Sequence, residues 1–262
     1  MYKEMSKEFM DIYIKLGAKY GNREIFFDFV KMCAIALYNP FAKNNKMEEE
    51  YLNTINKYQK EEQNLFPKMF AELINMYQEE DKPIDILGPF FEREQFSNGN
   101  LGQFFTPAHI SDFMSKVTIS DKEVLNKKIA RDGFITANDC ACGAGGMIIS
   151  FAKAIKEEGI NYQQNMLAVA NDISEICTYI TFIQFALLGI PAIVYCGDTM
   201  SQKMRFKLET PMYFLQYWKF EKFFQKNKEI ETESEAINDD NIISQNIFKE
   251  VSLKGNNQFC LW

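Results

Sequence analysis

The fold is decided by residues 134–147, FITANDCACGAGGM. An apolar run leads to an acid at Asp139, a loop with three glycines follows, and an apolar stretch of helical character begins at Met147. Glycines between a strand and a helix let the backbone approach a ligand closely, because a Cβ would clash and a positive φ is costly for other residues. A purely structural turn can have the same small residues, so the flanking sequence must distinguish a ligand-binding loop from such a turn.

The sequence after this loop repeats the same order of elements. We expect strands at 134–139, 166–170 and 192–196, and helices at 147–155 and 175–188. Strands that alternate with helices through short turns are typical of a right-handed parallel sheet in an α/β fold of the doubly wound kind.

The longest nearly uncharged run is Thr178–Tyr195. Gly189 and Pro191 interrupt it, so we interpret it as a buried helix, a turn and a strand, and not as a membrane span.

Each of the three expected strands ends at an acid, namely Asp139, Asp172 and Asp198. The carboxyl ends of parallel strands meet at one edge of the sheet, where open α/β folds bind their ligands. A carboxylate at Asp139 suits an ammonium group, Asp172 is spaced to bind a ribose diol, and Asp198 lies within reach of an adenine. The unpaired N–H groups at the start of the next helix add donors. These residues together predict a nucleoside pocket.

Four segments in this order carry a resemblance to a known family: Asp85–Gly88, Gly102–Pro107, Asp139–Met147 and Gly197–Met200. They resemble the adenine-N6 DNA methyltransferases of the type I restriction-modification modification-subunit group. The resemblance implies a Rossmann-like sheet that binds S-adenosylmethionine, and DNA as the substrate. The short length left after the last segment indicates that the sheet is incomplete. One departure is Cys140, where the family usually has proline.

The same resemblance implies a role for each motif residue. Phe104, Phe105 and Thr106 would line the methionine end of the cofactor. The residues implied for the rest of the cofactor are Asp139, Gly143, Gly145 and Gly146 for its amino-acid part, Asp172 for the ribose and Asp198 for the adenine edge.

The family's catalytic motif, Asn-Pro-Pro followed by Phe or Tyr, does not occur in the sequence. In the family, the Asn side chain and a backbone carbonyl polarise the target amine, and the aromatic ring stacks on the flipped base. Thr210–Tyr213 lies near the expected place and offers Pro211 and Tyr213 as catalytic candidates, whereas we interpret Asn39–Phe41 as a coincidence. Two hypotheses stand. The chain is an adenine-N6 DNA methyltransferase completed by unusual residues or a partner subunit, or a catalytically inactive S-adenosylmethionine-binding regulatory or assembly protein.

Composition limits the class of protein. The 262 residues carry a formal net charge of −7, which excludes a surface that binds nucleic acid over its whole extent but leaves local basic patches open. The six cysteines form no CxxC pair, so we expect reduced thiols, no metal site and a cytoplasmic protein. Residues 1–17 predict an amphipathic helix and not a signal peptide.

Helical spacing of apolar residues recurs over 26–37 and 49–77. We therefore expect an N-terminal helical domain at 1–100, a methyltransferase-like domain at 101–224 and a polar tail at 225–262.

Two segments near the C-terminus leave alternatives open. The aromatic run 212–224 suits either the stacking of nucleic-acid bases or a buried element that covers the sheet edge. The apolar end Gln258–Trp262 resembles a peptide that docks on the replication sliding clamp, and the alternative is that it docks on its own domain.

Overall fold

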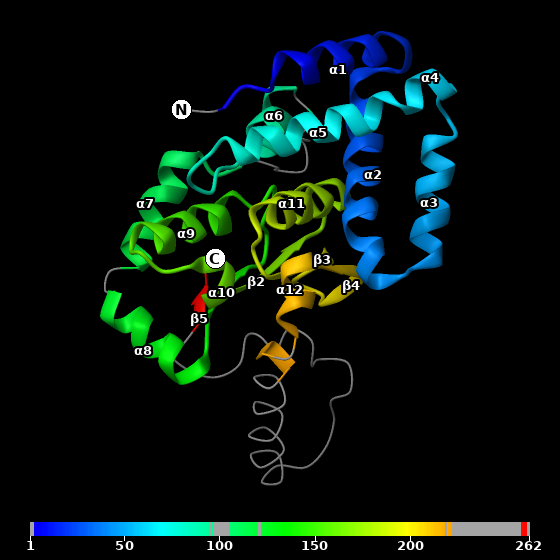
Figure 1. Ribbon diagram of the computed structural model, residues 1–262. Coiled ribbons are helices and arrows are strands. Elements are labelled where there is room, and N and C mark those ends of the chain that lie inside the picture. The colour runs from blue at the N-terminus through cyan, green and yellow to red at the C-terminus, as the bar shows by residue number, and fades with distance from the viewer. Residues whose placement is uncertain are drawn as a thin grey trace.

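In the computed structural model, a group of helices lies above a small sheet in a mixed α/β fold (Figure 1). The structure describes residues 3–94, 96, 105–119, 122–217 and 219–221, and the backbone of 258–260. The helices are α1 (Lys7–Tyr20), α2 (Asn22–Ala42), α3 (Asn45–Ile55), α4 (Lys60–Gln63), α5 (Leu65–Gln78), α6 (Leu87–Arg93), α7 (Ala108–Thr118), α8 (Lys122–Asp132), α9 (Gly146–Glu157), α10 (Tyr162–Asn165), α11 (Glu175–Leu188) and α12 (Pro211–Leu215). The strands are β1 (Ile135–Asp139), β2 (Met166–Asp172), β3 (Ala192–Asp198), β4 (Lys203–Glu209) and β5 (Gln258–Cys260).

Helix α2 lies at the centre of the helical segment α1–α6 and packs against α1, α3 and α11. By length and composition alone α2 could cross a membrane, but 56% of its apolar window is buried inside the protein, as in the core helix of a globular fold. The stretch expected to be helical over 49–77 is divided among α3, α4 and α5. The break between α3 and α4 occurs where the side chain of Tyr58 turns inward. This side chain is 4% exposed and donates a 2.7 Å hydrogen bond to Asp28 Oδ2 on α2.

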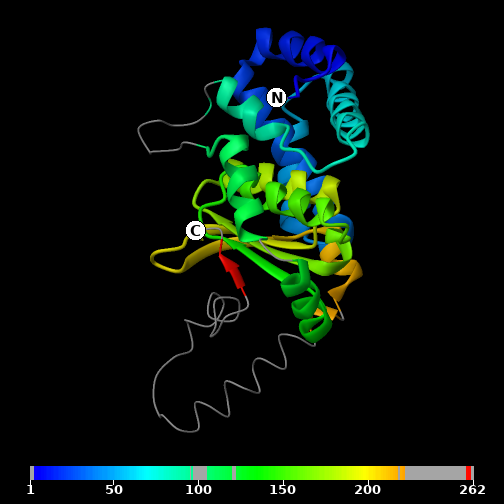
Figure 2. The same ribbon diagram turned by 90° about the vertical axis from the view of Figure 1, so that its left-hand side faces the viewer.

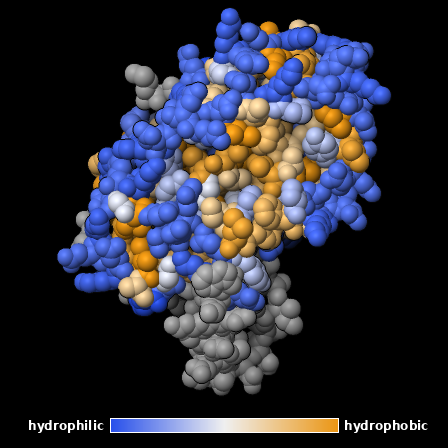
Figure 3. All heavy atoms as spheres, viewed as in Figure 1, coloured by the Kyte–Doolittle hydropathy of each residue, from blue (hydrophilic) through white to orange (hydrophobic). Residues whose placement is uncertain are grey.

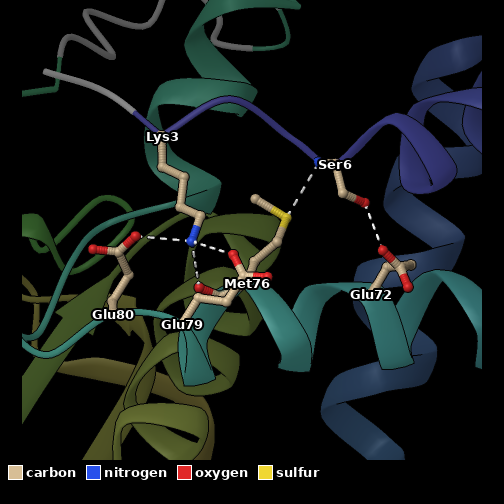
Figure 4. A network of polar contacts seen from close by, with 6 residues as sticks. All are labelled: Lys3, Ser6, Glu72, Met76, Glu79 and Glu80. Atoms are coloured by element: carbon tan, nitrogen blue, oxygen red, sulfur yellow. Dashed lines mark hydrogen bonds and ion pairs between the residues drawn. The ribbon is translucent and has the colours of Figure 1, made fainter.

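The segment before α1 is held against α5 by polar contacts (Figure 4). Lys3 Nζ donates to the carbonyl of Met76 at 2.9 Å and pairs with Glu79 and Glu80 at 3.0 and 2.8 Å. Ser6 Oγ donates to Glu72 Oε2 at 2.8 Å. The segment before α1 is therefore fixed at the end of α5 where Tyr77 contacts Gln184 of α11.

Helix α11 joins the helical segment to the sheet. It packs against α2, α5 and α6 and also against β2 and β3. Figure 3 shows apolar side chains gathered over α11 and α12 in the middle of one face, with hydrophilic side chains around them. One continuous cluster of buried apolar residues runs from α1 to β3, so the helical segment and the sheet share a core.

The sheet has the order β4-β3-β2-β1-β5. Strands β1, β2 and β3 are parallel, as the sequence predicts, with Ala137 opposite Ala168 and Ala168 opposite Ala192. Both crossovers step in the same direction across the sheet, and right-handed crossovers of that kind place both helices on one face. Accordingly α9 and α11 lie on the same side of the sheet as the helical segment (Figure 2).

The other face of the sheet has its own small apolar cluster. Alternate strand residues such as Leu167, Val169 and Ile193 point to it, and Tyr213 and Phe220 cover them with stacked rings 5.4 Å apart. This packing supports the interpretation of the aromatic run as a buried element and contradicts base stacking by Tyr213, which is only 7% exposed. Trp218 lies outside the residues that the structure describes.

Two strands were not expected from the sequence. Strand β4 returns antiparallel beside β3, and β5 pairs in parallel with β1, with Cys260 opposite Asn138. The backbone of Gln258–Cys260 therefore belongs to the sheet of its own chain, which leaves the sliding-clamp interpretation of this segment without support.

Candidate cofactor-binding site

The glycine loop connects the carboxyl end of β1 to the start of α9. Gly143 and Gly145 have φ of +55° and +86°, in the left-handed region that other residues avoid. A Cβ on Gly143 would lie 2.7 Å from the ring of Phe105, and one on Gly145 would lie 2.7 Å from the ring of Phe185. The glycines are therefore required by backbone conformation and by aromatic rings of the chain itself that pack on the loop.

Asp139 and Asp172 lie on the same face of the sheet, below this loop. Asp139 is 3% exposed, its Oδ1 accepts from the N–H of Ala141 at 3.1 Å, and burial raises the pKa of its carboxyl to about 6. Asp172 accepts from Gly143 N at 2.8 Å and from Ser174 N at 2.7 Å, so it joins the loop to the start of α11. Burial also raises the pKa of Asp172. The structure thus brings two of the three predicted acids to one place.

Asp198, the third acid, is the last residue of β3 and also lies at this edge, where its side chain contacts the turn between β3 and β4. Its two carboxylate oxygens accept from Met200 N at 2.9 Å and Ser201 Oγ at 2.8 Å, and the bond from Ser201 lowers its pKa. The carboxylate therefore stabilises the turn, which brings the following residues back into β4.

Asn171 is a site residue that the sequence interpretation missed. Its side-chain N–H groups donate to the carbonyls of Gly197 at 3.1 Å and Cys140 at 3.4 Å and to the hydroxyl of Thr199, so it ties the ends of β1, β2 and β3 together. Its Oδ1 is buried and has no hydrogen-bond partner within the described ranges. A signal was present, because the triplet Ala-Asn-Asp ends both β1 and β2, at 137–139 and 170–172.

Two cavities lie near this site, of which the smaller is lined by Gly146 of the loop and the larger by Ile173, which follows Asp172. The smaller one, about 130 Å³, lies between α6, α7 and α9, and its lining includes Asp85, Thr106, Ser111 and Gly146. Ser111 is 1% exposed, and its hydroxyl has no partner among the residues that the structure describes.

The larger cavity, about 630 Å³, lies between α2 and the start of α11. Its lining includes Arg23, Phe27, Phe91, Ile173 and Tyr179. Ile173 directly follows the buried Asp172 and is 65% exposed, so this cavity opens beside the predicted ribose-binding acid.

Of the three residues predicted to line the methionine end of the cofactor, the structure describes Phe105 and Thr106, and both line the smaller cavity. Phe105 packs on Gly143, with its ring centroid 5.7 Å from that of Phe91, which faces the larger cavity. Thr106 lines the smaller cavity. Phe104 lies outside the described ranges.

The structure does not bring Pro211 and Tyr213 to the loop. Thr210 N donates to Ala192 O, and Thr210 Oγ1 donates to Ile190 O, which places the start of α12 at the amino end of β3. Strand β3 has seven residues and a strand of that length spans roughly 20 Å, so both residues lie at the opposite edge of the sheet from Asp139. Strand β4 runs antiparallel and carries the chain away from the loop, so the structure does not place the two catalytic candidates beside the predicted cofactor residues, and their catalytic role stays a prediction.

Comparison with protein families identifies the chain's relationship. The family model for N-6 DNA methylases matches residues 82–241, which include the loop, its three acids and both of the parallel crossovers. No protein in the curated set that was compared matches the chain significantly. Since the matched segment covers more than half of the sequence, this chain belongs to the N-6 DNA methylase family.

Proposed function

We propose that this chain binds S-adenosylmethionine at the carboxyl edge of its sheet and serves as an adenine-N6-specific DNA methyltransferase of the type I modification-subunit kind. The observation that carries the proposal is that two buried carboxylates, Asp139 and Asp172, lie at the carboxyl ends of neighbouring parallel strands, where Asp172 accepts from Gly143 of the glycine loop. Charged groups buried at a strand end are typical of ligand sites and costly elsewhere.

The smaller cavity suits the amino-acid end of the cofactor. A methionine tail carries an ammonium donor and a carboxylate acceptor. Asp85 offers an acceptor at the cavity, and the Ser111 hydroxyl is buried there without a partner within the described part of the chain. The start of α9 at Gly146 contributes N–H donors that favour the carboxylate.

The larger cavity suits the nucleoside end. We assign the ribose hydroxyls to Asp172, whose oxygens each retain a lone pair after accepting one backbone hydrogen bond. Ile173 and the aromatic rings of Phe27 and Tyr179 offer apolar surface for an adenine ring. Asp198 keeps its proposed place at the adenine edge only if it retains its turn contacts while accepting from the base.

When bound, the cofactor supplies an electrophilic methyl group. The residues of this chain bind and orient that group. The lone pair of the exocyclic amine of adenine is delocalised into the ring, so hydrogen-bond acceptors must polarise this amine. Strand β5 ends at Cys260 opposite Asn138, at the same edge as Asp139. We infer that groups which polarise the amine act at this edge, between β1 and β5, and not near Tyr213.

Isothermal titration calorimetry with S-adenosylmethionine and S-adenosylhomocysteine tests the binding step. We expect saturable heat for both ligands with the folded chain, and at least tenfold weaker binding for Asp139→Asn, since a hydrogen bond to a charged group contributes about 1.5–3 kcal/mol. Absence of heat for either ligand from folded protein contradicts the proposal.

A second candidate is a cofactor-binding regulatory or assembly protein without catalysis. The absence of the Asn-Pro-Pro-aromatic motif from the sequence favours it. Transfer of labelled methyl groups to unmethylated DNA, measured with the chain alone and with candidate partner subunits, distinguishes the two. Label on adenine N6 supports the enzyme, whereas cofactor binding without label under every condition supports the regulatory protein.

A further inference from the structure

Gln184 is the one fully buried amide in the middle of α11, within the part of the chain that the structure describes. Its neighbours in the helix are largely apolar, and its own exposure is 0%. Burying an amide without hydrogen bonds is costly, so the partners of this side chain explain why it is tolerated there.

The oxygen of Gln184 holds the helical segment. Oε1 accepts from the backbone N–H groups of Ile86 at 2.9 Å and Leu87 at 3.1 Å and from the hydroxyl of Tyr77. Ile86 and Leu87 form the start of α6, where the backbone N–H groups of a helix have no intrahelical partner. One side-chain oxygen therefore fixes α5 and α6 against α11.

The nitrogen of Gln184 holds the glycine loop. Nε2 donates to the carbonyl of Ala144 at 2.8 Å and to Asp85 Oδ1 at 2.8 Å. Ala144 lies between Gly143 and Gly145, at the centre of the loop. Both amide hydrogens are used, so the same side chain that holds α6 also fixes the position of the loop.

Asp85 extends this contact to the start of α9. Its Oδ1 also accepts from Gly88 N at 2.8 Å, and its Oδ2 lies 3.0 Å from the position that a Cβ on Gly146 would take. Asp85 also lines the smaller cavity. The glycine at 146 thus leaves room for a carboxylate of the segment before α6.

We propose that Gln184 is a positioning residue for the cofactor loop, through which α5 and α6 become part of the cofactor site. This inference rests on the proposed function for its effect on binding. The helical segment then sets the conformation of the glycine loop.

Gln184→Glu distinguishes the hydrogen bonds accepted by Oε1 from those donated by Nε2. The variant keeps an oxygen for Ile86 N, Leu87 N and Tyr77, but it replaces the donor to Ala144 and Asp85 by a carboxylate oxygen, which repels both acceptors. Protonation of the new carboxyl restores a donor, so the loop contact should return as the pH falls. Wild type is measured at each pH, because burial raises the pKa of Asp85, which belongs to this contact and has Glu92 nearby, and also that of Asp139 in the same site, each to about 6.

Tyr38→Phe is the matched control. The Tyr38 hydroxyl donates a buried 3.0 Å hydrogen bond to Glu209 Oε2, which likewise joins the helical segment to the sheet, but at β4. The control loses a contact between the same two parts of the molecule and leaves the loop contact intact.

The first readout is hydrogen–deuterium exchange of the loop amides 143–146 without cofactor, and the second is the Kd for S-adenosylhomocysteine at pH 8 and pH 6. For Gln184→Glu we expect at pH 8 about tenfold or more faster exchange and about tenfold or more weaker binding, with partial recovery of both at pH 6. Tyr38→Phe should change neither. If Gln184→Glu does not fold, Asp85→Ala, which removes one of the two acceptors of Nε2, takes its place with loop exchange as its only readout, because Asp85 is itself assigned to the cofactor.

Loop exchange in the variant that equals that of Tyr38→Phe overturns the inference. If wild type binds no S-adenosylhomocysteine, the proposed function fails, but the exchange comparison still decides whether Gln184 positions the loop. Faster loop exchange with unchanged affinity in a binding-competent protein also overturns the positioning role.

Discussion

Gly145→Ala is expected to destabilise the protein more than any other glycine substitution at a comparable φ. Gly145 has φ +86° and precedes α9. A Cβ there would lie 2.7 and 3.0 Å from two ring carbons of Phe185 and 3.1 Å from Thr181 Cγ2. Both neighbours belong to the buried part of α11, so neither has free space into which to move.

The magnitude has two parts. The left-handed backbone conformation costs an alanine about 1–2 kcal/mol, and overpacking in a core of native density costs about 1–3 kcal/mol more. Gly133→Ala separates the two, because Gly133 has φ +84° but its Cβ would meet only Lys219 Cε, at 3.4 Å, the end of a flexible side chain. We therefore expect a loss of about 2–5 kcal/mol for Gly145→Ala and about 1–2 kcal/mol for Gly133→Ala.

Urea denaturation without cofactor measures both variants, with the free energy of unfolding taken from midpoints at equal m-values. An equal loss in the two variants would contradict a contribution from packing at Gly145. In that case the backbone conformation alone would account for the glycine, and the packing of Phe185 on the loop would be irrelevant to stability.

The remaining predictions concern the buried acid, the strand-end amide and β5. Burial raises the folded-state pKa of Asp139 to about 6, above an unfolded value near 4. The contribution of this carboxyl to the free energy of unfolding is therefore fully present below pH 4 and is lost as the pH rises through 6. At pH 8 the Asp139→Asn variant should therefore have a free energy of unfolding about 1–3 kcal/mol higher than wild type in urea denaturation, although it binds S-adenosylhomocysteine more weakly. Equal stability of wild type at pH 5 and pH 8 would contradict this. Asn171→Ala leaves the carbonyl of Gly197 without its side-chain donor and leaves that of Cys140 with Thr199 Oγ1 alone, and should lower the midpoint of thermal unfolding, equivalent to about 1–3 kcal/mol; an unchanged midpoint would show that the amide is dispensable. A chain shortened to residues 1–257 loses β5 and exposes the edge of β1, so light scattering should detect association that the full chain does not show; a monodisperse shortened chain would refute the importance of this pairing.

The sequence predicted the parallel part of the sheet because each of its strands is followed by a local signal. β1, β2 and β3 each end at an acid, and the intervening helices have apolar residues at helical spacing. Strand β4 carried a signal that the interpretation overlooked, since Met204, Phe206 and Leu208 alternate with charged residues. Strand β5 had no adequate signal, because three residues gain their structure only from pairing with β1, more than a hundred positions earlier.

The candidate site likewise has parts that the sequence predicted and parts that it did not. The positions of Asp139 and Asp172 follow from the rule that parallel strands end at one edge, and the structure brings these acids together. The role of Gln184 could not be predicted, since a glutamine in an apolar helix does not indicate that its partners lie about 40 and 100 positions away. Tyr213 was misplaced because the direction of β4 decides to which edge of the sheet α12 belongs.

The most direct test of the central claim is the change in hydrogen–deuterium exchange of the whole chain when S-adenosylhomocysteine is added. We expect slower exchange in Asp139–Gly146 and at the start of α11 after Asp172, where the loop and the two buried carboxylates lie, and little change in β4 and α12. No protection at the loop, or protection confined to the opposite edge of the sheet near Tyr213, would contradict it.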